Sequence, residues 1–147
     1  EGFTWQVEGQ TYGWHRAISL TRCEHVCIAQ LRGWLPNDIG GVLWYGAAAA
    51  GTTCFVPFYV GLNEVSEVIN TKAGSRMKFT RESYWWAAAS VMNYADLKWS
   101  YMIKDINAMQ QKYEGRVLRG QPAIDAAATE LLQPQHRRSA RRVEGSP

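Results

Sequence analysis

The stretch TRCEHVCIAQLRGWLP, residues 21–36, contains the end of a predicted strand and the turn that follows it. Residues 18–31 are rich in apolar and β-branched side chains and contain neither Gly nor Pro, which predicts one long strand. Gly33 and Pro36 then indicate the turn. We therefore expect this stretch to form a core strand of a layered fold.

The same stretch places Cys23, His25 and Cys27 two residues apart, and alternate residues of a strand share one face. Three interpretations follow: a metal site, a catalytic Cys–His pair, or packing residues. A structural zinc site needs four ligands, and the sequence offers no second ligand pair near Cys54. A buried thiol in mid-strand is also a poor nucleophile. The favoured interpretation is that the cysteines pack in the core and that His25 is hydrogen-bonded among them.

The regions on either side of this stretch are also predicted to be extended. Residues 2–17 alternate apolar and polar side chains around Gly9, which is typical of strands with one covered face. Residues 39–63 carry no charge, but Gly and Pro interrupt them, so we expect two buried strands, 41–47 and 53–60, rather than a membrane span. Continuous apolar strands predict that both faces are covered. Pro57 predicts an edge strand or a bulge.

After Gly74 the pattern changes to a helical period. Helices are predicted at 82–97 and 99–113, with Thr80 as a cap and Gly115 as the end of the second helix. A short last helix is predicted at 122–132. The apolar side chains of the second helix recur at helical spacing and are expected to pack in the core: Trp99, Met102, Ile106, Met109 and Tyr113. Strands followed by helices indicate an α+β fold, with residues 1–133 as one domain and 134–147 as a flexible Arg-rich tail.

Composition excludes some classes of function. The net charge of the 147 residues is +3, and it comes from the tail, where four Arg face one Glu. No basic cluster remains on the body, which argues against nucleic-acid binding. A disulfide scaffold usually has more cysteines than the three found here, and an even number of them. We therefore expect free thiols in a reducing compartment, with the cytoplasm favoured.

The order and spacing of several pieces between residues 14 and 114 resemble the C-terminal portion of the C69 dipeptidase family, which includes secernin-like proteins. The pieces that carry the resemblance are Arg16-Ala17-Ile18, Gln30-Leu31-Arg32 with Pro36, Ile39-Gly40-Gly41-Val42-Leu43-Trp44, Val56-Pro57-Phe58-Tyr59, Tyr84-Trp85 and Gln110 to Glu114.

The resemblance implies a cysteine hydrolase of the N-terminal nucleophile type, with a layered αββα sandwich to which this chain gives the C-terminal strands and helices. Such an enzyme cleaves small peptides or amides with a Cys whose own α-amino group is the base, and it needs no metal or organic cofactor. Cys23, Cys27 and Cys54 are internal and cannot supply that group. We therefore expect the nucleophile to lie outside this chain, and the chain alone to be inactive.

Two functions remain open: a portion of a dipeptidase, or a non-catalytic structural or interaction subunit that keeps the fold. In either case the apolar surface of the sheet would be uncovered in this chain alone. We therefore expect something else to cover it: a missing N-terminal region, a partner chain or another copy in a homo-oligomer. Within the dipeptidase hypothesis, Arg16 is the first candidate to line the site and bind a substrate carboxylate or an oxyanion, and His25 is the second.

Overall fold

The computed structural model describes residues 4–13, 15, 17–70 and 77–133. Arg16 and the predicted tail at 134–147 lie outside the described residues. The elements are β1 (Thr4–Val7), β2 (Gln10–Gly13), β3 (His25–Leu31), α1 (Asn37–Gly40), β4 (Gly41–Ala47), β5 (Val56–Tyr59), α2 (Tyr84–Leu97) and α3 (Trp99–Leu132). Strands precede helices, and both sheets are antiparallel, so the predicted α+β class is confirmed. No helix in the described part of the chain is long and apolar enough to cross a membrane.

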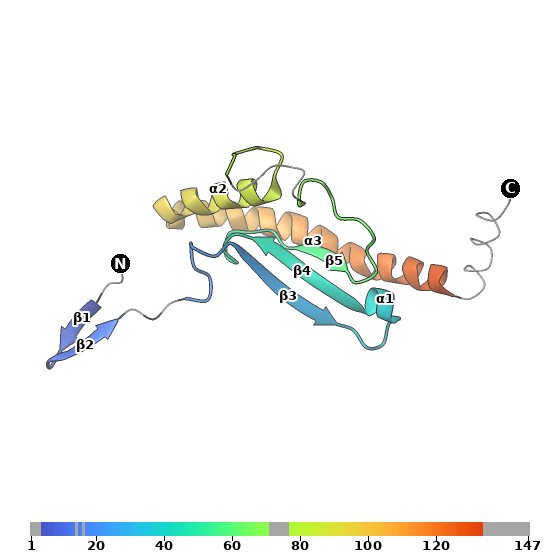
Figure 1. Ribbon diagram of the computed structural model, residues 1–147, viewed down its shortest axis with the longest axis horizontal. Helices are drawn as coiled ribbons and strands as arrows, with labels where there is room; N and C mark the ends of the chain where they lie inside the picture. The colour runs from blue at the N-terminus through green and yellow to red at the C-terminus, as the bar shows by residue number, and fades with distance from the viewer. Residues whose placement is uncertain (1–3, 14, 16, 71–76, 134–147) are drawn as a thin grey trace.

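Strands β1 and β2 form a hairpin that extends away from the rest of the molecule (Figure 1). Its two-residue turn has positive φ at Glu8 (48°) and Gly9 (78°), which is the geometry of the type I′ turn that matches strand twist. Trp5 pairs with Tyr12, and their rings stack at 6.4 Å. Trp5, Tyr12 and Val7 share one face of the hairpin, and each is about half exposed. The predicted alternation is thus confirmed over the described hairpin, but no described residue covers its apolar face.

The second sheet has the order β3-β4-β5, and α3 lies along one of its faces (Figure 1). Val42 and Trp44 of β4 point to this side and are buried. The prediction of a strand at 41–47 is confirmed by β4, and the strand predicted at 53–60 forms over the shorter range of β5. Pro57 lies in an edge strand, as its missing N–H predicts.

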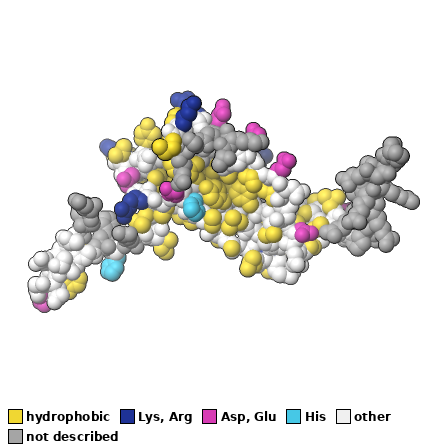
Figure 2. Space-filling model, in the orientation of Figure 1, with side chains coloured by type: hydrophobic (Ala, Val, Ile, Leu, Met, Phe, Trp, Pro, Cys, Tyr) yellow, Lys and Arg dark blue, Asp and Glu magenta, His cyan; other side chains and the backbone are white. Residues whose placement is uncertain are grey.

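Helix α2 packs on the opposite face at the Ala47 end of β4, and the described residues leave the rest of that face open. Leu43 of β4 is 43% exposed and Leu31 of β3 is 83% exposed, whereas a strand with both faces covered would bury them. In the view of Figure 2, hydrophobic side chains gather over the middle of the molecule, where the sheet lies in Figure 1. The prediction that both faces are covered is therefore wrong within the described residues. We call the side of the sheet that carries Leu31 and Leu43 the open face.

The predicted long strand at 18–31 is shorter than expected, because regular pairing begins only at His25. Residues 20–23 form a turn closed by a hydrogen bond from the Cys23 N–H to the Leu20 carbonyl. Strand β3 is an edge strand, and its side chains are mostly exposed. The prediction of a core strand is therefore wrong: Leu31 lies on the open face, and Ile28, on the α3 side, is still 52% exposed at the edge of the sheet.

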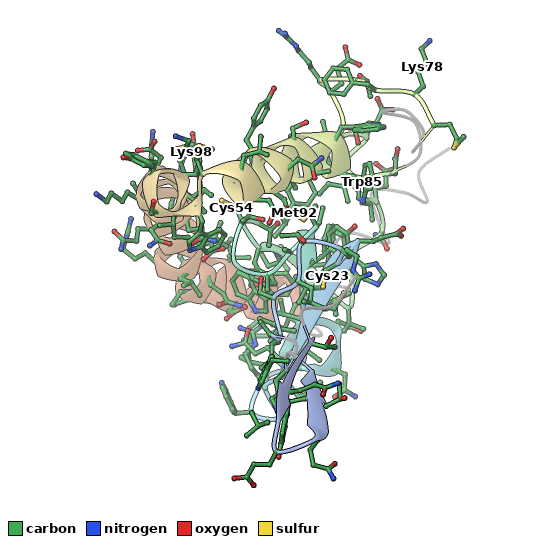
Figure 3. The ribbon with its side chains drawn as sticks, turned by 90° about the vertical axis from the view of Figure 1, so that its left-hand side faces the viewer. Cys23, Cys54, Lys78, Trp85, Met92 and Lys98 are labelled. Atoms are coloured by element: carbon green, nitrogen blue, oxygen red, sulfur yellow. The ribbon has the colours of Figure 1, made fainter. Side chains whose placement is uncertain are left out.

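The core lies where the end of β4 and the loop after it meet α2. Ala47, Ala48 and Ala49 pack against Ala88 and Met92 of α2. Figure 3 shows Met92 between the helix and the sheet, with Cys23 below it. Small residues allow this close approach of backbone to helix.

Helix α2 begins near its predicted start, although Ser83 rather than Thr80 is its N-cap residue. The hydroxyl of Thr80 instead accepts a hydrogen bond from the Glu82 N–H, two residues on. The hydroxyl therefore closes a turn before the helix and does not cap it.

Helix α3 is a single helix that runs through Gly115 and contains Pro122, so the prediction of two helices separated there is wrong. Both residues disfavour a helix interior, by about 1 kcal/mol for Gly and about 3 for Pro. The helix continues because side chains before and after this segment bind the sheet. The predicted apolar stripe is only partly right, since Ile106 is buried but Trp99, Met109 and Tyr113 are nearly half exposed.

Polar side chains connect α3 to the sheet. Glu114 accepts a hydrogen bond from the Phe55 N–H at 2.8 Å, and the Gln110 amide donates to the Thr53 carbonyl at 2.8 Å. Farther along, the Gln121 amide donates to the Gln30 side chain. The helix is thus fixed to the sheet along much of its length by groups that a search for apolar periodicity does not detect.

The strongest of these connections joins Arg32, after β3, to Asp125 of α3. The Arg32 guanidinium donates to the Asp125 carboxylate at 2.5 Å and to the Ile39 carbonyl at 2.6 Å, and it is buried. It also lies over the Tyr59 ring at 5.4 Å, and the Tyr59 hydroxyl donates to the other carboxylate oxygen at 2.9 Å. One ion pair therefore joins the end of β3, the α1 turn, β5 and α3.

We expect Asp125→Ala to destabilise the fold by about 3 kcal/mol, because it leaves the buried Arg32 charge without its carboxylate. Asp105→Ala removes an exposed carboxylate from the same helix and should change stability by less than about 0.5 kcal/mol. Urea unfolding followed by circular dichroism measures both. Equal stability of the two variants would contradict the role of the ion pair.

Candidate functional site

A small pocket lies at the end of the open face where β3 begins and β4 ends. It has a volume of about 290 Å³ and is lined by Glu24, His25, Tyr45 and Trp85. His25 comes from β3, Tyr45 from β4 and Trp85 from the first turn of α2. The pocket therefore brings together one imidazole, two aromatic rings and one carboxylate from three separate parts of the chain.

Tyr45 is the central ring of this pocket. It stacks on His25 with ring centroids 6.5 Å apart, and it meets Tyr84 at 6.1 Å and Phe58 at 6.2 Å. Burial raises the pKa of the Tyr45 hydroxyl, and the neighbouring Cys27 raises it further. The Tyr45 hydroxyl is thus a neutral hydrogen-bonding group at neutral pH rather than an anion.

Tyr84 anchors α2 to the sheet beneath this pocket. Its hydroxyl donates to the Cys54 carbonyl at 2.5 Å, lies 2.9 Å from the Thr53 hydroxyl, and accepts a hydrogen bond from the Ala47 N–H at 3.4 Å. Burial raises the pKa of this hydroxyl. Because Tyr84 is next to Trp85 in the helix, these bonds also fix one wall of the pocket.

The three cysteines have separate surroundings. Cys23 is partly buried against the alanine and methionine core, as predicted, whereas Cys27 is exposed, so its prediction as a packing residue is wrong. Burial and the Glu114 carboxylate raise the pKa of the Cys54 thiol, which disfavours its thiolate.

A shared face for Cys23, His25 and Cys27 required one continuous strand. Cys23 lies before the strand begins, so the alternation does not extend to it. In the described part of the chain, no group of three or more His, Cys, Asp or Glu side chains is placed to hold a metal ion.

The two predicted site residues have different outcomes. The structure places His25 in the pocket, exposed and beside Tyr45. Arg16 lies outside the described residues, so its role stays a prediction. Sequence reasoning missed Trp85 as a pocket residue, although the pair Tyr84-Trp85 was already distinctive at the start of the helix.

Sequence reasoning also missed Arg32 as the buried cation of the fold. The signal available was a lone Arg directly after an apolar strand and before a turn. Its guanidinium is already bound to protein groups, so it stabilises the fold rather than offering a free cation to a substrate.

Comparison with family models identifies the family of this chain. The profile of peptidase family C69 matches residues 4–112, which include every strand, α2 and the pocket. The chain belongs to peptidase family C69. This membership confirms the resemblance read from the sequence and indicates a peptidase-type function. Searches of curated proteins and of solved structures found no match.

The C69 match ends inside α3, between the groups that hold the helix to the sheet. Gln110 lies within the matched range, whereas Glu114, Gln121 and Asp125 lie beyond it. The pocket is therefore built from the family region, and the ion pair of Arg32 joins that region to the segment that follows.

We expect Tyr84→Phe to lower stability by about 1–3 kcal/mol, because the Thr53 hydroxyl and the Cys54 carbonyl lose their partner. Tyr101→Phe, at an exposed position of α3, is the matched control and should have little effect. Thermal unfolding followed by calorimetry measures the difference. If both variants unfold like the unmodified chain, the hydroxyl does not anchor α2.

The raised pKa of Tyr84 also predicts a pH dependence. Because folding raises this pKa, the unfolded chain releases the proton first, so the stabilisation is present below pH about 10 and is lost as the pH rises through the folded pKa. We expect stability to fall above that pH, and to fall less steeply in Tyr84→Phe. Urea midpoints between neutral and alkaline pH measure the slope, and identical slopes for the two proteins would contradict the prediction.

Proposed function

We propose that this chain forms one sheet and one helical layer of a dipeptidase-type cysteine hydrolase with an αββα sandwich. The observation that carries the proposal is the open face, which is apolar, belongs to a chain of peptidase family C69, and has an imidazole-containing pocket at one end. A second sheet packed on this face would bury the apolar side chains and enclose the pocket between two layers.

The second layer comes from outside the described residues, either from further sequence of the same protein, from a partner chain or from another copy. An exposed apolar sheet surface is unfavourable in water by about 25 cal/mol per Å². Leu43 lies in the central strand of this face, where an added layer would bury it most completely. Covering the open face is thus the physical reason to expect an additional layer.

The chemistry follows the N-terminal nucleophile scheme. A Cys outside this sequence attacks the scissile carbonyl with its thiolate, and its own α-amino group accepts the thiol proton and returns it to the leaving amine. His25 and Glu24 line the pocket at the sheet end and would bind the polar ends of a small peptide, while Tyr45 and Trp85 contact its apolar parts. Arg16 remains the candidate to bind a substrate carboxylate or an oxyanion.

The alternative function is a non-catalytic structural or interaction subunit that retains the fold. It is favoured by a second uncovered apolar surface, the face of the β1–β2 hairpin with Trp5, Val7 and Tyr12. Two uncovered apolar surfaces on one chain are typical of a subunit with extensive contacts. The two functions differ in whether peptide bonds are cleaved.

The test is dipeptide hydrolysis by the native protein, purified with every chain that accompanies it. We expect hydrolysis, and we expect His25→Ala to lower kcat/KM by about tenfold or more, because a pocket group that binds the substrate is lost. Arg16→Ala should lower it similarly while the circular dichroism spectrum is unchanged.

The matched control is His15→Ala, an exposed histidine outside the pocket, which should leave kcat/KM within about twofold. Absence of any hydrolysis by the native protein would favour the non-catalytic subunit. Hydrolysis that is unaffected by His25→Ala would remove His25 from the site while leaving the peptidase proposal intact.

A further inference from the structure

Among the described strands, β3 pairs only with β4, so its other edge is free there and unprotected. Edge strands normally contain a feature that prevents pairing with another chain, such as Lys, Pro or a bulge. At the other edge of the sheet, β5 is short and contains Pro57, which lacks an N–H. Strand β3 is longer, pairs regularly with β4 along its whole length, and contains no Lys, Arg, Asp, Glu or Pro.

The residues that offer hydrogen bonds at this edge follow from two bonds that flank the strand. The Arg32 N–H donates to the Gly40 carbonyl and the Ala48 N–H donates to the Glu24 carbonyl, so residues 24 and 32 point their backbone groups toward the β4 side. Backbone direction alternates along a strand, so His25, Cys27, Ala29 and Leu31 point theirs to the free edge.

We propose that β3 pairs with β3 of a second copy of this chain, antiparallel and centred on Ile28. This register places His25 opposite Leu31 and Cys27 opposite Ala29, so every residue of the strand has a partner and no two like charges face each other. The backbone groups at the free edge then form hydrogen-bonded pairs. The result is one continuous sheet with the two β3 strands at its centre.

The side chains support this occupant. A twofold axis perpendicular to the sheet at Ile28 puts the α3 sides of both copies on the same side of the joined sheet. On that side, a groove of about 370 Å³ runs beside β3. Residues of three strands or loops and of α3 line it: Ile28, Ala29, Gln30, Trp44, Phe55, Glu114 and Leu118. Ile28 is 52% exposed and Leu118 is 53% exposed. The second Ile28 would pack against the first at the mouth of this groove and remove both from water.

The pairing leaves the open face free, because it extends the sheet sideways rather than covering it. It is thus compatible with a second layer on that face and does not depend on peptidase activity. A strand from a different protein, or the β1–β2 hairpin of another copy, would use the same edge but would not place Ala29 opposite Cys27.

The register gives a direct test in the native protein. Hydrogen-bonded antiparallel partners have Cα atoms about 5.5 Å apart, which suits a disulfide. We expect Ala29→Cys to form a disulfide with Cys27 of the second copy on mild oxidation, seen as a covalent dimer and located by peptide mass mapping. Leu43→Cys is the matched control, since it lies on the same open face but one strand inward, between Ala29 and Phe58 of its own chain.

A second variant tests the pairing without a cross-link. Ile28→Lys should weaken dimerisation in sedimentation equilibrium by about tenfold or more, because it places two positive charges together at the axis. Leu97→Lys adds the same charge at an exposed site on α2 and should have no effect. A protein that remains monomeric at micromolar concentration, or a dimer in which Ala29→Cys does not cross-link to Cys27, would overturn the proposal.

Discussion

The buried ion pair between Arg32 and Asp125 joins distant parts of the chain at one point. On one side are the end of β3, the α1 turn and β5, and on the other is the last third of α3. A buried guanidinium must have partners for its donors, so this side chain, together with Gln110, Glu114 and Gln121, fixes where the helix crosses the sheet. Arg32 in turn fixes the turn that leads into β4, the central strand.

With α3 held on one face, the other face of the sheet carries the candidate site. It carries apolar side chains in the middle and, at one end, a pocket that combines His25 with aromatic rings. Tyr84 fixes the wall of this pocket, because its hydroxyl binds the loop between β4 and β5. This pocket and the membership of peptidase family C69 are the observations behind the proposal of a layered hydrolase.

The sequence was informative wherever local patterns were strong. Residues 41–47 form a strand within the bounds predicted from their uncharged apolar run, and Pro57 lies in an edge strand as its missing N–H requires. The family was also recognisable, because several short pieces occur in a fixed order, and the profile match confirms it.

The sequence was misleading where long-range contacts outweighed local preference. Gly115 predicts the end of one helix and Pro122 the start of another, but Glu114 and Asp125 form long-range hydrogen bonds on either side of them and hold one helix together. Residues 18–31 predict a core strand, but apolar content does not reveal whether a neighbour covers it. The pocket wall at Trp85 could not be predicted, since it depends on how α2 packs against the end of β4.

The central claim is that the open face is covered by a second layer in the working protein. Thiol labelling of Leu43→Cys in a Cys27→Ser background measures this directly, because residue 43 lies on the open face in the middle strand. The account predicts that the native protein alkylates at this thiol at least about tenfold more slowly than the urea-unfolded protein. Alkylation at the same rate in the two states would show an uncovered face and contradict the account.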